Sequence, residues 1–303
     1  MAQGYWDRED QCQQLFDEGG PFFLITTAHT DFLSFSTEAD FITGTNIEAL
    51  CLVGTRVRIL IETIMHTHLH SVAEGHRDEV LTYTESLRRK MHRFQKSRGY
   101  ELGADWEIQM LPLDNLKALR NAILYVARNA YLAMPNATPT GYRWCSAYLL
   151  FNQIIPYLET GSPFDEISYR EKRKVCHSHL IEQVPANFHI RDGMILRSSF
   201  VDYRRTEGFF QSANQFFAFL SKRGESDVEV ARLTHERIQL PDDEVFSIVS
   251  SWFRGRKIRE LDLRERLETA LRMRRELASG DKQIAQILRI PADHVKRLFS
   301  GSG

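Results

Sequence analysis

The chain has 303 residues, is 43% hydrophobic and 26% charged, and carries a formal net charge of −1. These values are typical of a globular protein with one large domain or two ordinary ones, and they exclude a uniformly basic coat. No apolar run approaches the ~20 residues of a membrane span. The polar, acidic start over residues 1–18 is unlike a signal peptide.

The four cysteines are scattered along the chain, and none belongs to a Cys-x-x-Cys pair. Cys12, Cys51, Cys145 and Cys176 are therefore expected to be reduced thiols. This pattern predicts a cytoplasmic protein.

Strand-like and helix-like patterns alternate over residues 21–151. In chain order, the predicted elements are a strand at 21–27, a helix at 41–53, a strand at 57–62, a short strand at 71–74, a helix at 76–98, a strand at 107–113 and a helix at 115–132. Asp114 is the predicted N-cap of the last helix. The order β-α-β-β-α-β-α predicts an α+β fold in which an antiparallel sheet carries helices on one face.

The predicted helix at 76–98 has an apolar stripe and a basic face. The stripe consists of Val80, Leu81, Leu87, Met91 and Phe94. The basic residues are Arg88, Arg89, Lys90, Arg93, Lys96 and Arg98, with no acid between residues 87 and 99. Such a patch attracts a polyanion, although a solvated helix face has the same pattern. A second basic region at 254–275 is diluted by acids, so we expect a solvated face there.

Beyond about residue 152 the pattern changes to mixed helices and loops, which predicts a separate, mainly helical region over 152–303. We expect five phenylalanines in this region to be mostly core residues: Phe209, Phe210, Phe216, Phe217 and Phe219. The pattern of residues 263–299 predicts an amphipathic helix followed by two short helices. This order is typical of a helix-turn-helix. In that arrangement His294, Lys296 and Arg297 are exposed on the last helix.

A histidine-rich segment, His66-Thr67-His68-Leu69-His70, leads into the strand at 71–74. Residues two apart in a strand point to the same face, so His68 and His70 are expected side by side, with Leu69 turned into the core. Two imidazoles held in this way can share a divalent ion. A half-exposed strand that happens to carry histidines gives the same pattern.

The helix at 115–132 holds Tyr125-Val126-Ala127-Arg128-Asn129. Tyr125 and Asn129 are four residues apart and therefore share one helix face. A phenol with a pKa of about 10 is a poor nucleophile at neutral pH, but a metal that polarises a phosphate makes it useful. A core tyrosine beside a surface asparagine is the alternative.

Together these segments resemble the single-tyrosine HUH transposases, in particular the REP-associated tyrosine transposases and their long-tailed branch. The resemblance covers about residues 19–150. It rests on Gly19-Gly20-Pro21-Phe22-Phe23, on Met65-His66-Thr67-His68-Leu69-His70 for Met-Pro-Asn-His-x-His, on Tyr125 to Asn129 for Tyr-x-x-x-Asn-Pro, and on Tyr142-Arg143-Trp144-Cys145-Ser146-Ala147-Tyr148 for aromatic-Ser-Ser-Tyr.

The resemblance implies a ferredoxin-like HUH domain over residues 1–151, with an accessory region over 152–303. It implies that His68, His70 and Asn129 bind Mg²⁺ or Mn²⁺. Tyr125 would attack a phosphate in single-stranded DNA and form a 5′-phosphotyrosine, which a second 3′-hydroxyl would resolve by joining strands. The basic helix and the C-terminal helix would hold a DNA hairpin, which implies a nucleoid-associated protein. The oligomeric state stays open between monomer and homodimer.

The chain departs from the family pattern at three positions: His66, Thr67 and Ala130 stand where the family has Pro, Asn and Pro. Without a proline at 130, the helix is expected to continue past Asn129. His66 is either an extra ligand or a residue that bonds to water near the turn.

Two rival interpretations remain open from the residues. In the first, the scaffold is retained but the chain only binds a DNA hairpin as a regulator. In the second, it is an unrelated metal phosphoesterase, although no third carboxylate ligand stands at a useful spacing.

Overall fold

The computed structural model describes residues 3–28, 30, 32–103, 106–133, 138, 140–176, 180–221, 242–253, 256–277 and 279–300. The chain forms two compact units, Met1–Tyr131 with Asn136–Leu220, and Leu132–Pro135 with Ser221–Gly303. The predicted boundary near residue 151 is therefore wrong, because residues 152–220 belong to the first unit.

The first unit is built on a four-stranded antiparallel sheet with the strand order β2-β3-β1-β4. Its elements up to residue 133 are α1 (Gln3–Asp17), β1 (Phe22–Thr27), α2 (Glu38–Cys51), β2 (Arg58–Ile64), β3 (Leu69–Glu74), α3 (Arg77–Ser97), β4 (Ile108–Pro112) and α4 (Leu116–Ala133). From β1 to β4 this is β-α-β-β-α-β with β1 and β3 in the centre, which is a ferredoxin-like arrangement. The predicted α+β class and antiparallel sheet are confirmed.

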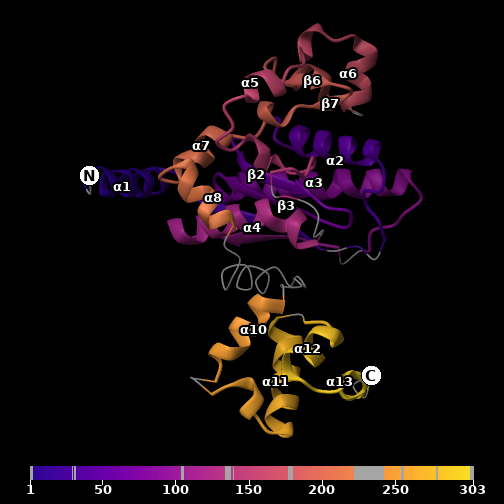
Figure 1. The fold of residues 1–303 in the computed structure, drawn as a ribbon. Coiled ribbons are helices and arrows are strands. Elements are labelled where there is room, and N and C mark those ends of the chain that lie inside the picture. The colour runs from indigo at the N-terminus through magenta and orange to yellow at the C-terminus, as the bar shows by residue number, and fades with distance from the viewer. Residues whose placement is uncertain are drawn as a thin grey trace. The chain divides into compact units, whose positions relative to one another are not determined.

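The sheet is covered on both faces, so the prediction of helices on one face is wrong (Figure 1). Consecutive strand residues point to opposite faces. His70 contacts Tyr125 of α4, whereas its neighbour Ser71 lies beside Tyr83 of α3. The helices α2 and α3 therefore cover one face, and α4 covers the other.

Local capping residues determine where two of the helices begin. Thr37 accepts from the backbone N–H of Asp40 at 3.2 Å and forms a capping box, so α2 begins at Glu38, earlier than the sequence predicted. Before α4, Asn115 Oδ1 accepts from the N–H of Ala118 at 2.8 Å. The cap is thus Asn115, and the prediction of Asp114 is off by one residue.

Residues 146–221 wrap the sheet with short elements. These are the 3-10 turns η1 (Ser146–Leu149), η2 (Phe164–Glu166), η3 (Leu180–Gln183) and η4 (Arg197–Ser199), the helices α5 (Ile155–Leu158), α6 (Tyr169–Cys176), α7 (Tyr203–Gly208) and α8 (Ala213–Ser221), and the strands β5 (Ser162–Pro163), β6 (His189–Arg191) and β7 (Met194–Ile195). The three strands pair into a second small sheet that the sequence did not predict, although most of the regular structure in this segment is helical.

A buried charged cluster fastens this segment to the sheet. Arg197 donates to Glu62 of β2 and, at 3.0 Å, to Thr45 of α2. Burial raises the pKa of Glu48 well above its usual range, and the neighbouring Glu62 raises it further, so Glu48 holds its proton to higher pH than an exposed glutamate. The N–H of Asp202 donates to Ile59 O of β2 at 2.7 Å. A chain cut near residue 151 would leave Glu62 buried without its arginine.

Most of the predicted core positions are buried. Phe209, Phe210 and Phe216 lie inside, and Phe209 packs edge-on against Phe22 of β1 at 5.5 Å between ring centroids. Phe217 and Leu81 are exceptions, because both are exposed. All four cysteines are free and buried. In the described part of the chain no helix is long and apolar enough to cross a membrane.

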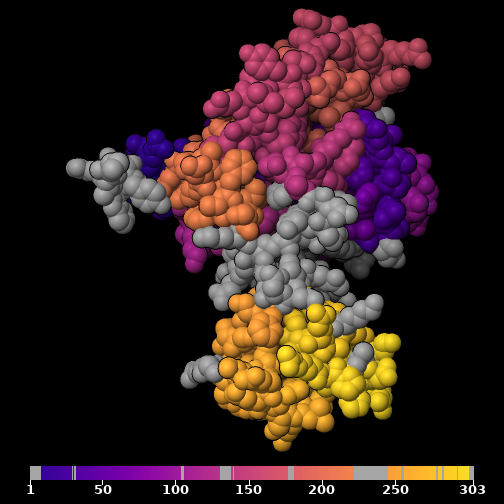
Figure 2. All heavy atoms as spheres, in the orientation of Figure 1, coloured from indigo at the N-terminus to yellow at the C-terminus, as the bar shows by residue number. Residues whose placement is uncertain are grey.

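The described part of the second unit is helical, and its atoms from residue 242 onward form a compact body (Figure 2, light orange to yellow). Its described elements are α10 (Asp242–Ser251), the 3-10 turn η5 (Ile258–Glu260), α11 (Leu263–Glu276), α12 (Asp281–Leu288) and α13 (Ala292–Ser300). Ile284, Leu288 and Val295 are fully buried. The three predicted C-terminal helices are present, and their use as a helix-turn-helix stays a prediction.

Replacing Arg197 by Met should lower the free energy of unfolding by about 3–5 kcal/mol, because it leaves Glu62 as an uncompensated buried charge. Urea denaturation at pH 7 measures this loss. The control is Arg204→Met, since Arg204 pairs with Glu207 while 64% exposed and should contribute less than about 1 kcal/mol. Equal, small losses in both variants would contradict the role of Arg197.

Candidate functional site: a histidine pair facing a tyrosine helix

His70 occupies the centre of the sheet on the α4 face, with Thr26 of β1 and Thr63 of β2 as its cross-strand partners. His68 lies just before β3, and the rings of His68 and His70 are 4.8 Å apart between centroids. The predicted side-by-side arrangement is therefore present, and Leu69 is buried on the other face. Both histidines are also buried, so the alternative of a half-exposed strand does not describe this segment.

The helix α4 brings the two other predicted residues to this pair. The ring of Tyr125 meets the ring of His70 at 5.5 Å between centroids. One turn further on, Asn129 Oδ1 lies 3.3 Å from His68 Nε2. The helix continues to Ala133, as expected for a chain without a proline at position 130. The four residues proposed to act together thus lie in one continuous set of contacts.

The donor atoms at this place fit a divalent ion. Neighbouring ligands of an octahedral ion with bonds of about 2.1 Å are about 3 Å apart, close to the separation of His68 Nε2 and Asn129 Oδ1. Thr67 Oγ1 lies 3.0 Å from His68 Nδ1, which is the kind of partner that orients a ligating imidazole. Among the described residues no three His, Cys, Asp or Glu side chains gather as a metal site. The amide of Asn129 is thus needed to complete a set of three protein ligands.

His66 takes no part in this arrangement. Its Nδ1 lies 2.7 Å from the backbone carbonyl of Phe35, and its ring packs edge-on against Phe41. The sequence suggested that His66 is either an extra metal ligand or a residue bonded to water. Its ring instead forms a hydrogen bond with the backbone of Phe35. His66 holds the 35–41 segment against the turn before His68.

Tyr125 is fully buried, with 0% of its surface exposed. A phosphate in DNA reaches its hydroxyl only after the surrounding protein moves. Other tyrosines have different surroundings: Tyr83 lies on the opposite face of the sheet, Tyr142 donates to Ile64 O at 2.9 Å, and Tyr148 donates to Glu159 at 2.8 Å. Burial raises the pKa of both Tyr142 and Tyr148, which makes their phenols harder to ionise. Only Tyr125 is seen to contact the histidine pair in the described part of the chain.

The basic face of α3 divides into three parts. Arg88, Arg89, Arg93 and Lys96 are exposed, and Lys90 is half-buried. Arg98 instead serves the fold: its guanidinium donates to Ser34 O at 2.6 Å and pairs with Asp40 at 3.0 Å. The prediction that Arg98 holds DNA is therefore hard to reconcile with its contacts. In the second unit, Lys296 and Arg297 of α13 are exposed.

Two residues near the site, one half-buried and one buried, were not predicted from the sequence. Thr67 was noted only as a departure from the family pattern, yet it contacts His68. Arg128 is buried, and its Nη1 donates to Phe219 O of α8 at 3.0 Å, which ties α8 to α4. A charged residue within an otherwise apolar helix turn was the available signal for Arg128.

Comparisons with known proteins give one loose match. No family model matches the chain, and no curated protein matches it. A solved structure that resembles it is a REP-associated tyrosine transposase bound to a REP hairpin, with 14% sequence identity and a TM-score of 0.34 over 43% of this chain and 79% of that one.

Removing a proposed ligand should weaken the binding of Mn²⁺. His68→Ala and Asn129→Ala should each reduce the affinity by more than about tenfold, because loss of an outer-shell partner alone costs about 10–100-fold. Isothermal titration calorimetry with Mn²⁺ measures the change. His66→Ala is the matched control and should bind as the unchanged chain does. Unaltered affinity in both ligand variants would place the ion elsewhere.

Proposed function

We propose that this protein cleaves and rejoins single-stranded DNA beside hairpins, with Tyr125 as the nucleophile. The observation that carries the proposal is the chain of contacts from Tyr125 through His70 and His68 to Asn129. A tyrosine, two imidazoles and an amide oxygen converge from two elements that the ferredoxin-like sheet places face to face. This set suits attack on a phosphate next to a divalent ion.

His68, His70 and Asn129 would hold Mg²⁺ or Mn²⁺, which when bound withdraws electron density from a phosphate and stabilises the leaving oxygen. The phenol of Tyr125 loses its proton, and its oxygen bonds to phosphorus. The bond from phosphorus to the 3′-oxygen of the preceding nucleotide breaks, and that oxygen takes up a proton. The products are a 5′-phosphotyrosine and a free 3′-hydroxyl. Attack by a second 3′-hydroxyl reverses the step and joins two strands without ATP.

The exposed cations of α3 would contact the DNA backbone. Arg88, Arg89 and Lys96 are exposed on one helix, and phosphate contacts of this kind position DNA without reading its sequence. Lys296 and Arg297 on α13 would add a second contact, either in a major groove or with a partner. Sequence recognition would then depend on the shape of a hairpin together with base contacts from other residues.

A second candidate function is hairpin binding without cleavage, as a regulator. The observation that favours it is the complete burial of Tyr125, because a nucleophile must meet its phosphate. Both candidates use the same DNA contacts. They differ only in whether a covalent bond to Tyr125 forms.

Tyr125→Phe should abolish the covalent adduct between the protein and single-stranded DNA while leaving hairpin binding within about twofold. The change removes one oxygen and keeps the ring that packs on His70. Denaturing gel electrophoresis with labelled, hairpin-flanked DNA and Mn²⁺ detects the adduct. Tyr157→Phe is the control, since Tyr157 is 81% exposed and should leave the adduct intact.

Two results would speak against this assignment. An adduct that persists in Tyr125→Phe would move the nucleophile to another tyrosine. No adduct in the unchanged chain with either metal would favour the binding function.

Replacing Arg88, Arg89 and Lys96 together by Ala should weaken binding of all DNA sequences alike. Each lost phosphate contact should reduce the slope of log K against log[salt] by about one unit. Fluorescence anisotropy at several salt concentrations measures the slope. Lys117→Ala removes an exposed cation of α4 and serves as the control. A loss confined to one sequence, with the slope unchanged, would show that these residues read bases.

A further inference from the structure

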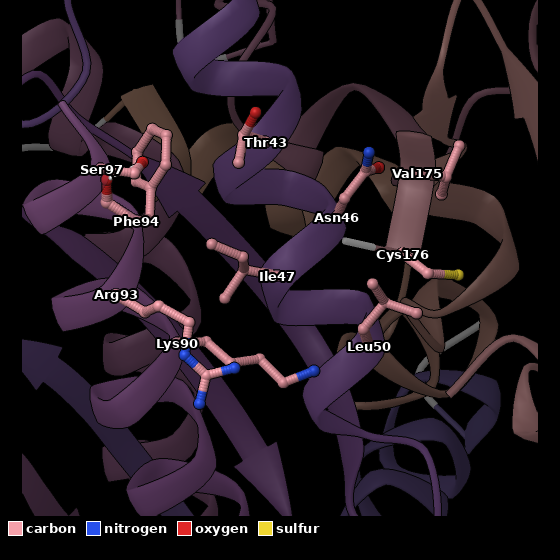
Figure 3. A pocket seen from close by; sticks show the side chains of 10 residues that line it. All are labelled: Thr43, Asn46, Ile47, Leu50, Lys90, Arg93, Phe94, Ser97, Val175 and Cys176. Carbon is pink, nitrogen blue, oxygen red and sulfur yellow. Dashed lines mark hydrogen bonds between the residues drawn. The ribbon is translucent and has the colours of Figure 1, made fainter. Parts of the chain in front are cut away.

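A cavity of about 300 Å³ lies between α2, α3 and α6, and it is lined by Thr43, Asn46, Ile47, Leu50, Lys90, Arg93, Phe94, Ser97, Val175 and Cys176. It opens beside the basic helix on the sheet face opposite the histidine pair. Figure 3 shows Ile47 near the middle of the view and the side chains of Lys90 and Arg93 along its lower side, where the ammonium of Lys90 extends toward Leu50. The cavity therefore has an apolar body and a cationic end.

The polar groups of the wall are already engaged, apart from the two cations. Asn46 donates to Gly193 O and accepts from the N–H of Ile195, each at 2.8 Å. The hydroxyls of Thr43 and Ser97 donate to backbone carbonyls of their own helices. The strong donors left for a ligand are thus the ammonium of Lys90 and the guanidinium of Arg93, beside the weakly donating thiol of Cys176.

No acid lines the cavity, and no ion pair of Lys90 or Arg93 is found within the described ranges. The two residues are three apart on α3, so they share one face of the helix. A phosphate monoester carries about −1.5 to −2 charges at pH 7 and matches two cations. A carboxylate or an internal phosphodiester of DNA carries only one charge and leaves one cation without a partner.

We propose that this cavity binds a phosphate monoester with an apolar or aromatic body. The phosphate lies on Lys90 and Arg93, and the body packs against Ile47, Leu50, Phe94 and Val175. A free nucleoside 5′-monophosphate and the 5′-phosphate end of a DNA strand share this chemistry. The proposal goes beyond the proposed function and does not depend on it, because the cavity contains none of the residues of the histidine–tyrosine site.

Calorimetric titration with thymidine 5′-monophosphate tests the proposal, and the Tyr125→Phe chain is used so that no DNA is cleaved. Thymidine 5′-monophosphate should bind at least tenfold more tightly than inorganic phosphate, and thymidine without phosphate should not bind measurably. Affinity should fall when the pH is lowered from 7.5 to 5.5, because the second phosphate pKa is about 6.

Five variants separate binding in the cavity from binding to the basic helix in general. Lys90→Gln and Arg93→Gln should each weaken thymidine 5′-monophosphate binding at least tenfold. Arg88→Gln and Lys96→Gln remove the same charge from the same helix outside the lining and should change it less than twofold. Ser97→Trp should block the cavity without altering a core position, because Ser97 is an exposed lining residue.

Paired oligonucleotides identify the source of the phosphate. The ligand is a strand end if a 5′-phosphorylated strand binds more tightly than the same strand with a 5′-hydroxyl, and if thymidine 5′-monophosphate competes away that difference. No difference between the strands, with thymidine 5′-monophosphate still bound, would identify a free ligand. The proposal is overturned if neither probe binds, or if the Arg88 and Lys96 variants lose as much affinity as the Lys90 and Arg93 variants. Because no readout involves cleavage, these outcomes are independent of the role of Tyr125.

Discussion

The buried contact between Arg197 and Glu62 is the constraint on which the first unit depends. Both side chains are almost completely inside the protein. A charge buried on the sheet has to be compensated by its partner, so β2 requires the segment that carries Arg197. Thr45 of α2 shares the arginine, which connects the sheet, a helix on its face and the later segment through one side chain. The segment at 152–220 is for this reason part of the core domain.

The candidate site depends on the alternation of side chains along β3. Leu69 packs and Ser71 lies beside Tyr83 on the α2–α3 face, while His70 points to α4. A shift of one residue in the pairing of β3 would exchange these faces and separate the histidine pair from Tyr125. The pairing of Thr26 and Thr63 with His70 therefore holds the proposed chemistry in position. Because Tyr125 is fully buried, the protein around it has to move before a phosphate can reach its hydroxyl.

Much of the candidate site could be predicted, because it depends on short-range spacing and on a family resemblance. His68 and His70 were placed together by the two-residue strand period, and Tyr125 and Asn129 by the four-residue helix spacing. Burial of the pair could not be predicted, since it depends on α4 packing over β3. The contacts of Arg98 with Ser34 and Asp40 could not be predicted either, because they join residues about 60 positions apart.

The sequence by itself determined the elements between residues 21 and 132 and their order, since helix caps and strand periods act over a few residues. It also placed the apolar stripe of α3 and the three C-terminal helices. Only the tertiary structure decided that helices cover both faces of the sheet, that the first unit extends to residue 220, and that Lys90 and Arg93 border a cavity. Each of these features depends on contacts between segments that are distant in the sequence. The free energy of those contacts comes from burying apolar surface and from pairing charges, and a local sequence pattern does not predict either.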